Sequence, residues 1–237
     1  MRQRLNKPVF RDNDSARGMY ERVQGLYPDA IVTQSYLRLE KYIPTTGSTV
    51  INFDVLTNNG TPSSVERRLN LTDKFVITAI SVMIYTPPTR ANTADADRSQ
   101  STLRTWNNPL VFSGTGEAAQ LQTIYNGYLR MIIDSVTYLD SIDTQRFYRA
   151  PTAQKGLIQS TGTAGTGTSP NVQGDGYEST HYPFAQLTPT ITLNGAGRNE
   201  ISLNMPSASA VSTASLNNYV VCYLRGFLAQ NASQLNK

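Results

Sequence analysis

Histidine and cysteine are almost absent from this sequence. The 237 residues include one histidine, His181, and one cysteine, Cys222. A single cysteine excludes an intrachain disulfide, and a single histidine excludes a metal site built on paired histidines of one chain. Because Cys222 lies in a strongly apolar stretch, we expect a small core residue rather than a thiol activated by His181.

Long apolar runs are also missing. No stretch approaches the roughly 20 consecutive apolar residues that a helix needs to cross a bilayer. The N-terminal sequence MRQRLNKPVFRDND lacks the apolar run that signal peptides carry. We therefore expect neither a membrane span nor a signal peptide.

Charge is sparse and unevenly placed. Only 16% of the residues are charged, and the formal net charge is +4. Arg2, Arg4, Lys7 and Arg11 precede every acidic residue, and the rest of the chain holds 17 basic and 17 acidic side chains. A body without net charge resists self-association poorly. This distribution favours a protein that works inside an assembly.

Residues 1–13 are predicted to form an extended basic arm. Four cations on a flexible tether suit contact with a neighbouring subunit or with nucleic-acid phosphates. Four charges are few for packaging a genome, so we favour the subunit contact. A solvated terminus without a partner is the alternative that needs no function.

Acidic residues offer little catalytic chemistry. Asp134, Asp140 and Asp143 come closest to a carboxylate cluster, but aspartate near turns commonly bonds its own backbone. The sequence GTAGTGTS at residues 162–169 resembles a phosphate loop in composition and lacks the required lysine. We predict that the protein is not an enzyme and holds no cofactor or metal.

Strand patterns dominate the chain. Alternating or continuous apolar stretches predict strands at residues 31–43, 49–56, 65–70, 74–85, 128–139, 145–149, 190–193, 200–205 and 219–228. Two of them, 74–85 and 219–228, are apolar on both faces and should be central strands. The turn residues 194–199 predict a β-hairpin between their neighbours, and Pro206 should end its second strand.

Two short helices are predicted. Residues 14–26 follow the candidate caps Asp14 and Ser15, with an apolar side of Met19, Tyr20, Val23 and Leu26. Residues 115–125 form the second helix, with Thr115 as its cap.

About eight or nine strands and one or two short helices predict an all-β fold, a single β-sandwich of the jelly-roll or Greek-key kind. Residues 1–30 form the arm and a short helix, and residues 31–237 form the sandwich. Long loops are expected at 86–108 and 156–176, and the second is rich in glycine, serine and threonine.

Several segments carry a resemblance to known proteins. The stretches PLVFSGTGEAAQLQTIYNGYL, DTQRFYRAP, PTITLNGAGRNEISLNMP and YVVCYLRGFL, with the basic arm before a neutral β body, resemble bacteriophage virion proteins, in particular jelly-roll capsid subunits. The resemblance implies an icosahedral capsid subunit that acts by self-assembly. It also implies a protein made in the host cytoplasm and located in the virion, with copies of itself and other virion proteins as partners.

Tyr20, Leu26 and Trp106 are our candidates for subunit contacts, together with the arm. Two alternatives remain open. The first is an auxiliary virion protein, such as a vertex, decoration, tail-tube or connector subunit. The second is a lectin-like, glycan-binding module. The thirteen tyrosines could stack on glycans in the lectin-like module.

Overall fold

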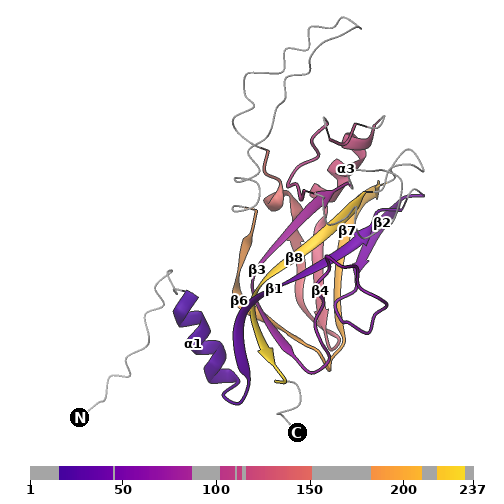
Figure 1. The fold of residues 1–237 in the computed structure, drawn as a ribbon. Coiled ribbons are helices and arrows are strands. Elements are labelled where there is room, and N and C mark those ends of the chain that lie inside the picture. Colours follow the sequence, from indigo (N-terminus) through magenta and orange to yellow (C-terminus); the bar gives the residue numbers. More distant parts are fainter. Residues whose placement is uncertain are drawn as a thin grey trace, which may run out of the picture.

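The computed structural model describes residues 16–44, 46–86, 102–109, 111–113, 116–150, 183–209 and 218–232. Two antiparallel sheets of four strands each pack face to face, and α1 lies beside one sheet while α3 lies at one end (Figure 1). The main core forms between the sheets and draws apolar side chains from both. This arrangement confirms the predicted all-β sandwich.

The elements follow one another along the chain as α1 (Ala16–Leu26), β1 (Ile31–Tyr42), β2 (Ser48–Phe53), β3 (Lys74–Tyr85), α3 (Glu117–Tyr125), β4 (Tyr128–Ile133), β5 (Val136–Asp143), the 3₁₀ helix η1 (Thr144–Phe147), β6 (Ala185–Asn194), β7 (Asn199–Ser209) and β8 (Tyr219–Gln230). Sheet A has the strand order β1-β8-β3-β6, and sheet B has the order β2-β7-β4-β5. We call the face of each sheet that points away from the main core its outer face.

The strand pairs are nested. β4 pairs with β5, β3 with β6, β2 with β7 and β1 with β8, all antiparallel. Only the β4–β5 connection joins neighbours in one sheet, whereas the other connections cross between the sheets. The predicted hairpin across residues 194–199 is therefore wrong, because β6 and β7 lie in opposite sheets. Turn residues predict a chain reversal, but the pairing partner depends on burial across the core.

The two predicted central strands are confirmed. β8 lies between β1 and β3, and β3 lies between β8 and β6. Both strands are buried on both faces over most of their length. Their outer faces are covered in part by α1, which packs Val23 against Val32, Val76 and Phe227.

The predicted strand 128–139 is wrong as a single element, because the chain reverses in its middle. Asp134 and Ser135 take positive φ angles of 48° and 69° and form the tight turn between β4 and β5. Neither residue is glycine or asparagine, so the usual hairpin signal is missing. The predicted turn at 140–143 lies in β5, and the predicted strand 145–149 is largely the helix η1.

Several predicted ends shift. α3 begins after Gly116, which takes the N-cap position with φ 72°, while Thr115 lies outside the described residues. Pro206 does not end β7, which continues to Ser209, because the β2–β7 register shifts near this proline. Asp14 and Ser15, proposed caps of α1, also lie outside the described residues.

Only two bridges form in the predicted strand 65–70. Arg67 pairs with Arg38 of β1, and Leu69 pairs with Leu56. The segment thus runs along the free edge of sheet A at Arg67 without forming a full strand.

Candidate functional site

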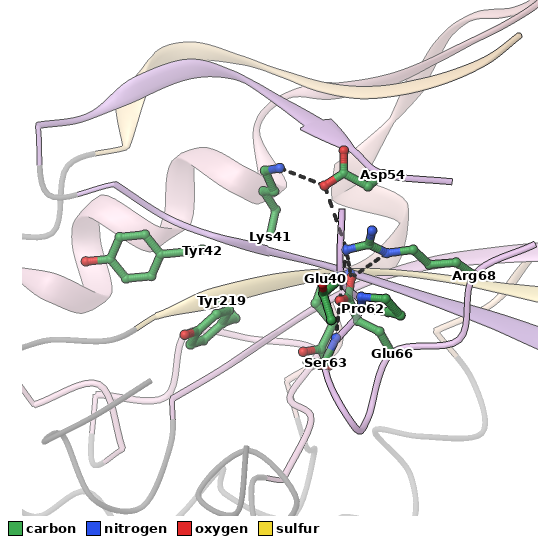
Figure 2. Close-up of a pocket in the computed structure, with 10 residues that line it drawn as sticks. Glu40, Lys41, Tyr42, Asp54, Pro62, Ser63, Glu66, Arg68 and Tyr219 are labelled. Carbon is green, nitrogen blue, oxygen red and sulfur yellow. Dashed lines mark hydrogen bonds and ion pairs between the residues drawn. The ribbon is translucent and has the colours of Figure 1, made fainter. Parts of the chain in front are cut away.

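A polar cavity of about 400 Å³ opens beside the end of β1 (Figure 2). β1 supplies Glu40, Lys41 and Tyr42, and β8 supplies Tyr219. The rest of the wall comes from Asp54 and from residues 61–68. Alternation along β1 places Lys41 on the opposite face of the strand from Glu40 and Tyr42.

One side of the cavity is an ion network around Arg68. The Arg68 guanidinium is almost buried and contacts Glu66 at 3.0 Å and Asp54 at 3.8 Å. Lys41 Nζ contacts the same Asp54 oxygen at 2.9 Å. Figure 2 shows these side chains converging from three segments. Glu66 also accepts hydrogen bonds from the backbone N–H groups of Glu40 and Ser63.

A second buried pair lies behind this network. Glu40 accepts a hydrogen bond of 2.7 Å from Arg38 Nε and another of 2.7 Å from the Tyr85 hydroxyl. The Glu40 side chain is only 1% exposed, and Arg38 is 17% exposed. A carboxylate buried in this way needs such partners, because unpaired burial of charge is costly.

These contacts limit the chemistry of the cavity. Each carboxylate that lines it is already held by a cation or by backbone N–H groups, so the network fastens residues 54–68 to β1. In the part of the chain that the structure describes, no group of three or more His, Cys, Asp or Glu side chains could hold a metal ion. The remaining binding capacity is that of a polar cleft beside the partly exposed ring of Tyr42.

The three aspartates singled out from the sequence do not form a site. Asp134 accepts a hydrogen bond from the Arg198 N–H at 2.8 Å, and Asp143 accepts one from the Gln145 N–H at 2.9 Å. Asp140 lies 3.8 Å from Arg130 on the surface. For Asp143 the predicted bond to its own backbone is confirmed, whereas Asp134 bonds the backbone of the distant turn between β6 and β7.

Cys222 is fully buried in the core, as predicted. Burial raises the pKa of its thiol, so the side chain stays protonated at neutral pH. His181 lies outside the described residues, and so does the loop at 156–176.

The predicted contact residues have different surroundings. Tyr20 packs on Phe227 with ring centroids 6.2 Å apart, so part of this ring serves α1 docking. Leu26 is 61% exposed and does not join the apolar side of α1, contrary to the predicted stripe. Trp106 is half-buried, two residues beyond the Arg104 bridge to β3. Arg2, Arg4, Lys7 and Arg11 lie outside the described residues, as do positions 87–101 of the loop 86–108.

The sequence analysis missed a cluster of aromatic rings and arginines on the outer face of sheet A. Tyr36 of β1 stacks on Tyr223 of β8 with centroids 5.2 Å apart. Arg67 lies over the Tyr36 ring at 5.3 Å, and Arg225 lies over the Phe184 ring at 3.8 Å. We call these five residues the tyrosine–arginine cluster. Tyrosine and arginine at outward positions of β1 and β8 were the available signal.

The cluster changes the ionisation of one of its members. Burial raises the pKa of Tyr223, and the neighbouring Tyr36 adds to this rise. The guanidinium groups of Arg225, Arg38 and Arg67 act in the opposite direction, because positive charge favours the phenolate. Three arginines therefore lie close enough to Tyr223 to act on it electrostatically.

Within the ranges that the structure describes, neither α1 nor α3 is long and apolar enough to span a membrane. Comparison of the chain with family models, with curated proteins and with solved structures found no match.

Proposed function

We propose that the sandwich is a jelly roll. The support is the nested pairing, in which β1 pairs with β8, β2 with β7, β3 with β6 and β4 with β5. One long antiparallel hairpin of four strand pairs, rolled up so that successive pairs alternate between two sheets, gives this order. Eight strands in two packed sheets are typical of the jelly roll, which occurs in viral capsid proteins, lectins and cupins.

From this fold and the resemblance to virion proteins we infer a structural subunit of a bacteriophage capsid. The nested pairing is the observation that carries the inference. The subunit acts by self-assembly into an icosahedral shell, with the sandwich as the rigid block and the N-terminal arm reaching a neighbour. The neutral body and the basic arm support the same function, because they favour association over a dispersed monomer.

The β4–β5 hairpin is the surface we assign to contact between copies. Tyr128, Val136 and Tyr138 are 42%, 57% and 54% exposed, and β5 is a free edge of sheet B. An exposed edge strand with apolar side chains readily pairs with another chain. Large exposed aromatic side chains are also typical of protein interfaces.

The proposal is tested with the purified full-length chain by light scattering during size exclusion and by negative-stain microscopy. Stable shell interfaces bury more than about 2,000 Å² in total, so we expect particles or large oligomers even on dilution. Closed shells support the capsid subunit, whereas rings or tubes favour an auxiliary virion protein. A monomer that stays dispersed at every protein and salt concentration contradicts the proposal.

A second candidate function is glycan binding, and the cavity of Figure 2 favours it. Its polar groups lie beside the ring of Tyr42, which is 37% exposed and is in edge contact with Tyr219 at 5.7 Å. Sugars are commonly held by an aromatic face together with hydrogen-bonding groups. Saturable binding of the parent chain to a glycan array, abolished in Tyr42→Ala, would support this function. Binding that is unchanged in Tyr42→Ala would remove the cavity from consideration.

A further inference from the structure

The register of sheet A brings the tyrosine–arginine cluster together. Arg38 of β1 lies directly opposite Tyr223 of β8 on one side and Arg67 on the other. In the neighbouring outward row, Tyr36 lies opposite Arg225. Directly paired residues of antiparallel strands point to the same face, so Arg38 and four members of the cluster, Tyr36, Arg67, Tyr223 and Arg225, share the outer face of the sheet.

Two cations of this face lack an acidic partner in the part of the chain that the structure describes. Arg67 and Arg225 are exposed, and no ion pair to either guanidinium occurs among the described residues. Both guanidinium groups lie over the faces of aromatic rings. Arg38 differs, because Glu40 neutralises it. Within the described residues, the cluster thus has two positive charges without a counter-charge, one on each side of the stacked tyrosine rings.

The four strands around the cluster contain almost no acid. Sheet A carries four basic residues, Arg38, Lys41, Lys74 and Arg225, and a single acid, the buried Glu40. Sheet B carries one basic residue, Arg130, and three acids, Asp140, Asp143 and Glu200. Lys41 points to the other face of β1 and is paired with Asp54, so the strand charges on the outer faces are +2 for sheet A and −2 for sheet B. A polyanion would be attracted to the first sheet and repelled by the second.

We propose that the tyrosine–arginine cluster on the outer face of sheet A binds single-stranded nucleic acid. A base stacks on the face of Tyr36 that the Arg67 guanidinium covers at 5.3 Å, because Tyr223 stacks on the ring at 5.2 Å. Arg67 then moves from the ring to a flanking phosphate, and Arg225 contacts another phosphate; the Tyr36 side chain is accessible for this exchange, since the residue is 39% exposed. Aromatic stacking platforms within a positively charged surface are the usual means of holding single strands without sequence preference. A duplex keeps its bases stacked on one another and gains only the phosphate contacts.

This site goes beyond shell formation and does not depend on it. An acidic peptide would match the charge of Arg67 and Arg225, but it would leave the stacked tyrosine rings without a planar partner. The rings therefore favour nucleic acid over a peptide. The same ring and guanidinium contacts would serve DNA or RNA, since both present a base face and a phosphate.

The test measures fluorescence anisotropy of labelled oligothymidylate and oligouridylate with the full-length chain, at protein concentrations where light scattering detects no particles. Tyr36→Ala should weaken binding about tenfold, which is the loss of one stacked base. Tyr36→Phe, which keeps the ring, should bind as the parent chain does. Arg67→Gln and Arg225→Gln should each reduce the slope of log affinity against log salt by about 0.7.

Matched controls lie on sheet B. Val50→Ala and Arg130→Gln remove an exposed apolar side chain and an exposed arginine and should leave the affinity unchanged. A chain with Arg2, Arg4, Lys7 and Arg11 all changed to Gln separates binding by the arm from binding by the cluster. Polyglutamate should not compete with the oligonucleotides at equal charge.

Three results would overturn the proposal. The first is that Tyr36→Ala binds the oligonucleotides as tightly as the parent chain. The second is that the sheet B controls lose as much affinity as the sheet A variants. The third is that the arm variant loses all binding while the cluster variants bind as the parent chain does. Preference for oligothymidylate or oligouridylate decides between DNA and RNA and leaves the site in place. Circular dichroism of each variant confirms that the fold is retained.

Discussion

Sheets A and B share one core but have different outer faces. The outer face of sheet A carries two apolar clusters, one under α1 and one around Tyr85 and Tyr219, with the tyrosine–arginine cluster between them. The outer face of sheet B is largely polar and more acidic. The two faces are therefore suited to different neighbours. The outer face of sheet A is covered in part by α1 and carries positive charge. The β4–β5 hairpin of sheet B leaves apolar side chains exposed.

The burial patterns of β8 and β7 express the same difference. β8 is buried at nearly every position, because side chains cover both of its faces. β7 alternates between buried and partly exposed positions through its first half, because only one of its faces is covered. A strand with a continuously apolar sequence is thus buried on both faces, and a strand with an alternating sequence is buried on one face.

The largest expected effect is on assembly. Tyr138→Asp places a charge on the free edge of sheet B, where we expect another copy to pack, and should abolish particle formation. Thr33→Asp is the matched change at an exposed position of β1 in sheet A and should leave particles intact. Negative-stain particle counts check both variants. Equal loss of particles in the two would remove the distinction between the sheets as assembly surfaces.

A core residue under α1 should have the largest effect on stability. Phe227 is 5% exposed on the outer face of sheet A and packs against Val23 and Tyr20. Phe227→Ala should reduce the free energy of unfolding by about 3–5 kcal/mol. Tyr128→Ala, on the outer face of sheet B and 42% exposed, should cost about 0.5 kcal/mol or less. Urea titration measures the free energy of unfolding of both variants. Equal losses would contradict the conclusion that the outer face of sheet A is buried under α1 while that of sheet B is exposed.

The buried ion pair of β1 should have a somewhat smaller effect. Glu40→Gln leaves Arg38 without a counter-charge and directs an N–H donor at either Arg38 or the Tyr85 hydroxyl. We expect a loss of about 3 kcal/mol, in the range for removing one partner of a buried pair. Glu200→Gln, which breaks an exposed pair in sheet B, should cost less than about 1 kcal/mol. A small loss in both variants would show that the Glu40 network is well hydrated.

The smallest expected effect depends on pH. Burial raises the pKa of Cys222 in the folded chain, so its stabilising contribution is complete below the unfolded pKa of about 8.5 and falls as the pH rises above it. Cys222→Ala removes this dependence. The stability difference between the parent chain and Cys222→Ala should therefore narrow by about 2 kcal/mol between pH 8 and 10. A constant difference would indicate that the thiol ionises in the folded state.

The sequence predicted the elements that are decided by local patterns. The doubly apolar strands β3 and β8 were placed correctly, since continuous apolar runs identify central strands. The β4–β5 turn was missed because Asp134 and Ser135 adopt positive φ without the residues that usually signal it. The pairing of β6 and β7 with other strands was missed because contacts distant in sequence decide sheet membership.

The same limit applies to the sites. The burial of Cys222 could be predicted from its strand alone. The tyrosine–arginine cluster could not, because Tyr36, Arg67 and Arg225 become neighbours only through the pairing of β1 with β8 and with the residue 67 bridge. The Glu40–Tyr85 hydrogen bond also joins residues far apart along the chain, from β1 and β3.

A cryo-electron microscopy map of particles formed by the chain, at a resolution that separates the two sheets, tests both the capsid assignment and the roles of the two sheets. We expect a closed shell in which Tyr138 of β5 lies at a contact between copies and the Tyr36 face of sheet A lines the interior. The absence of any particle would contradict the capsid assignment, and a shell in which the β4–β5 hairpin touches no neighbour and the Tyr36 face points outward would contradict the roles of the two sheets.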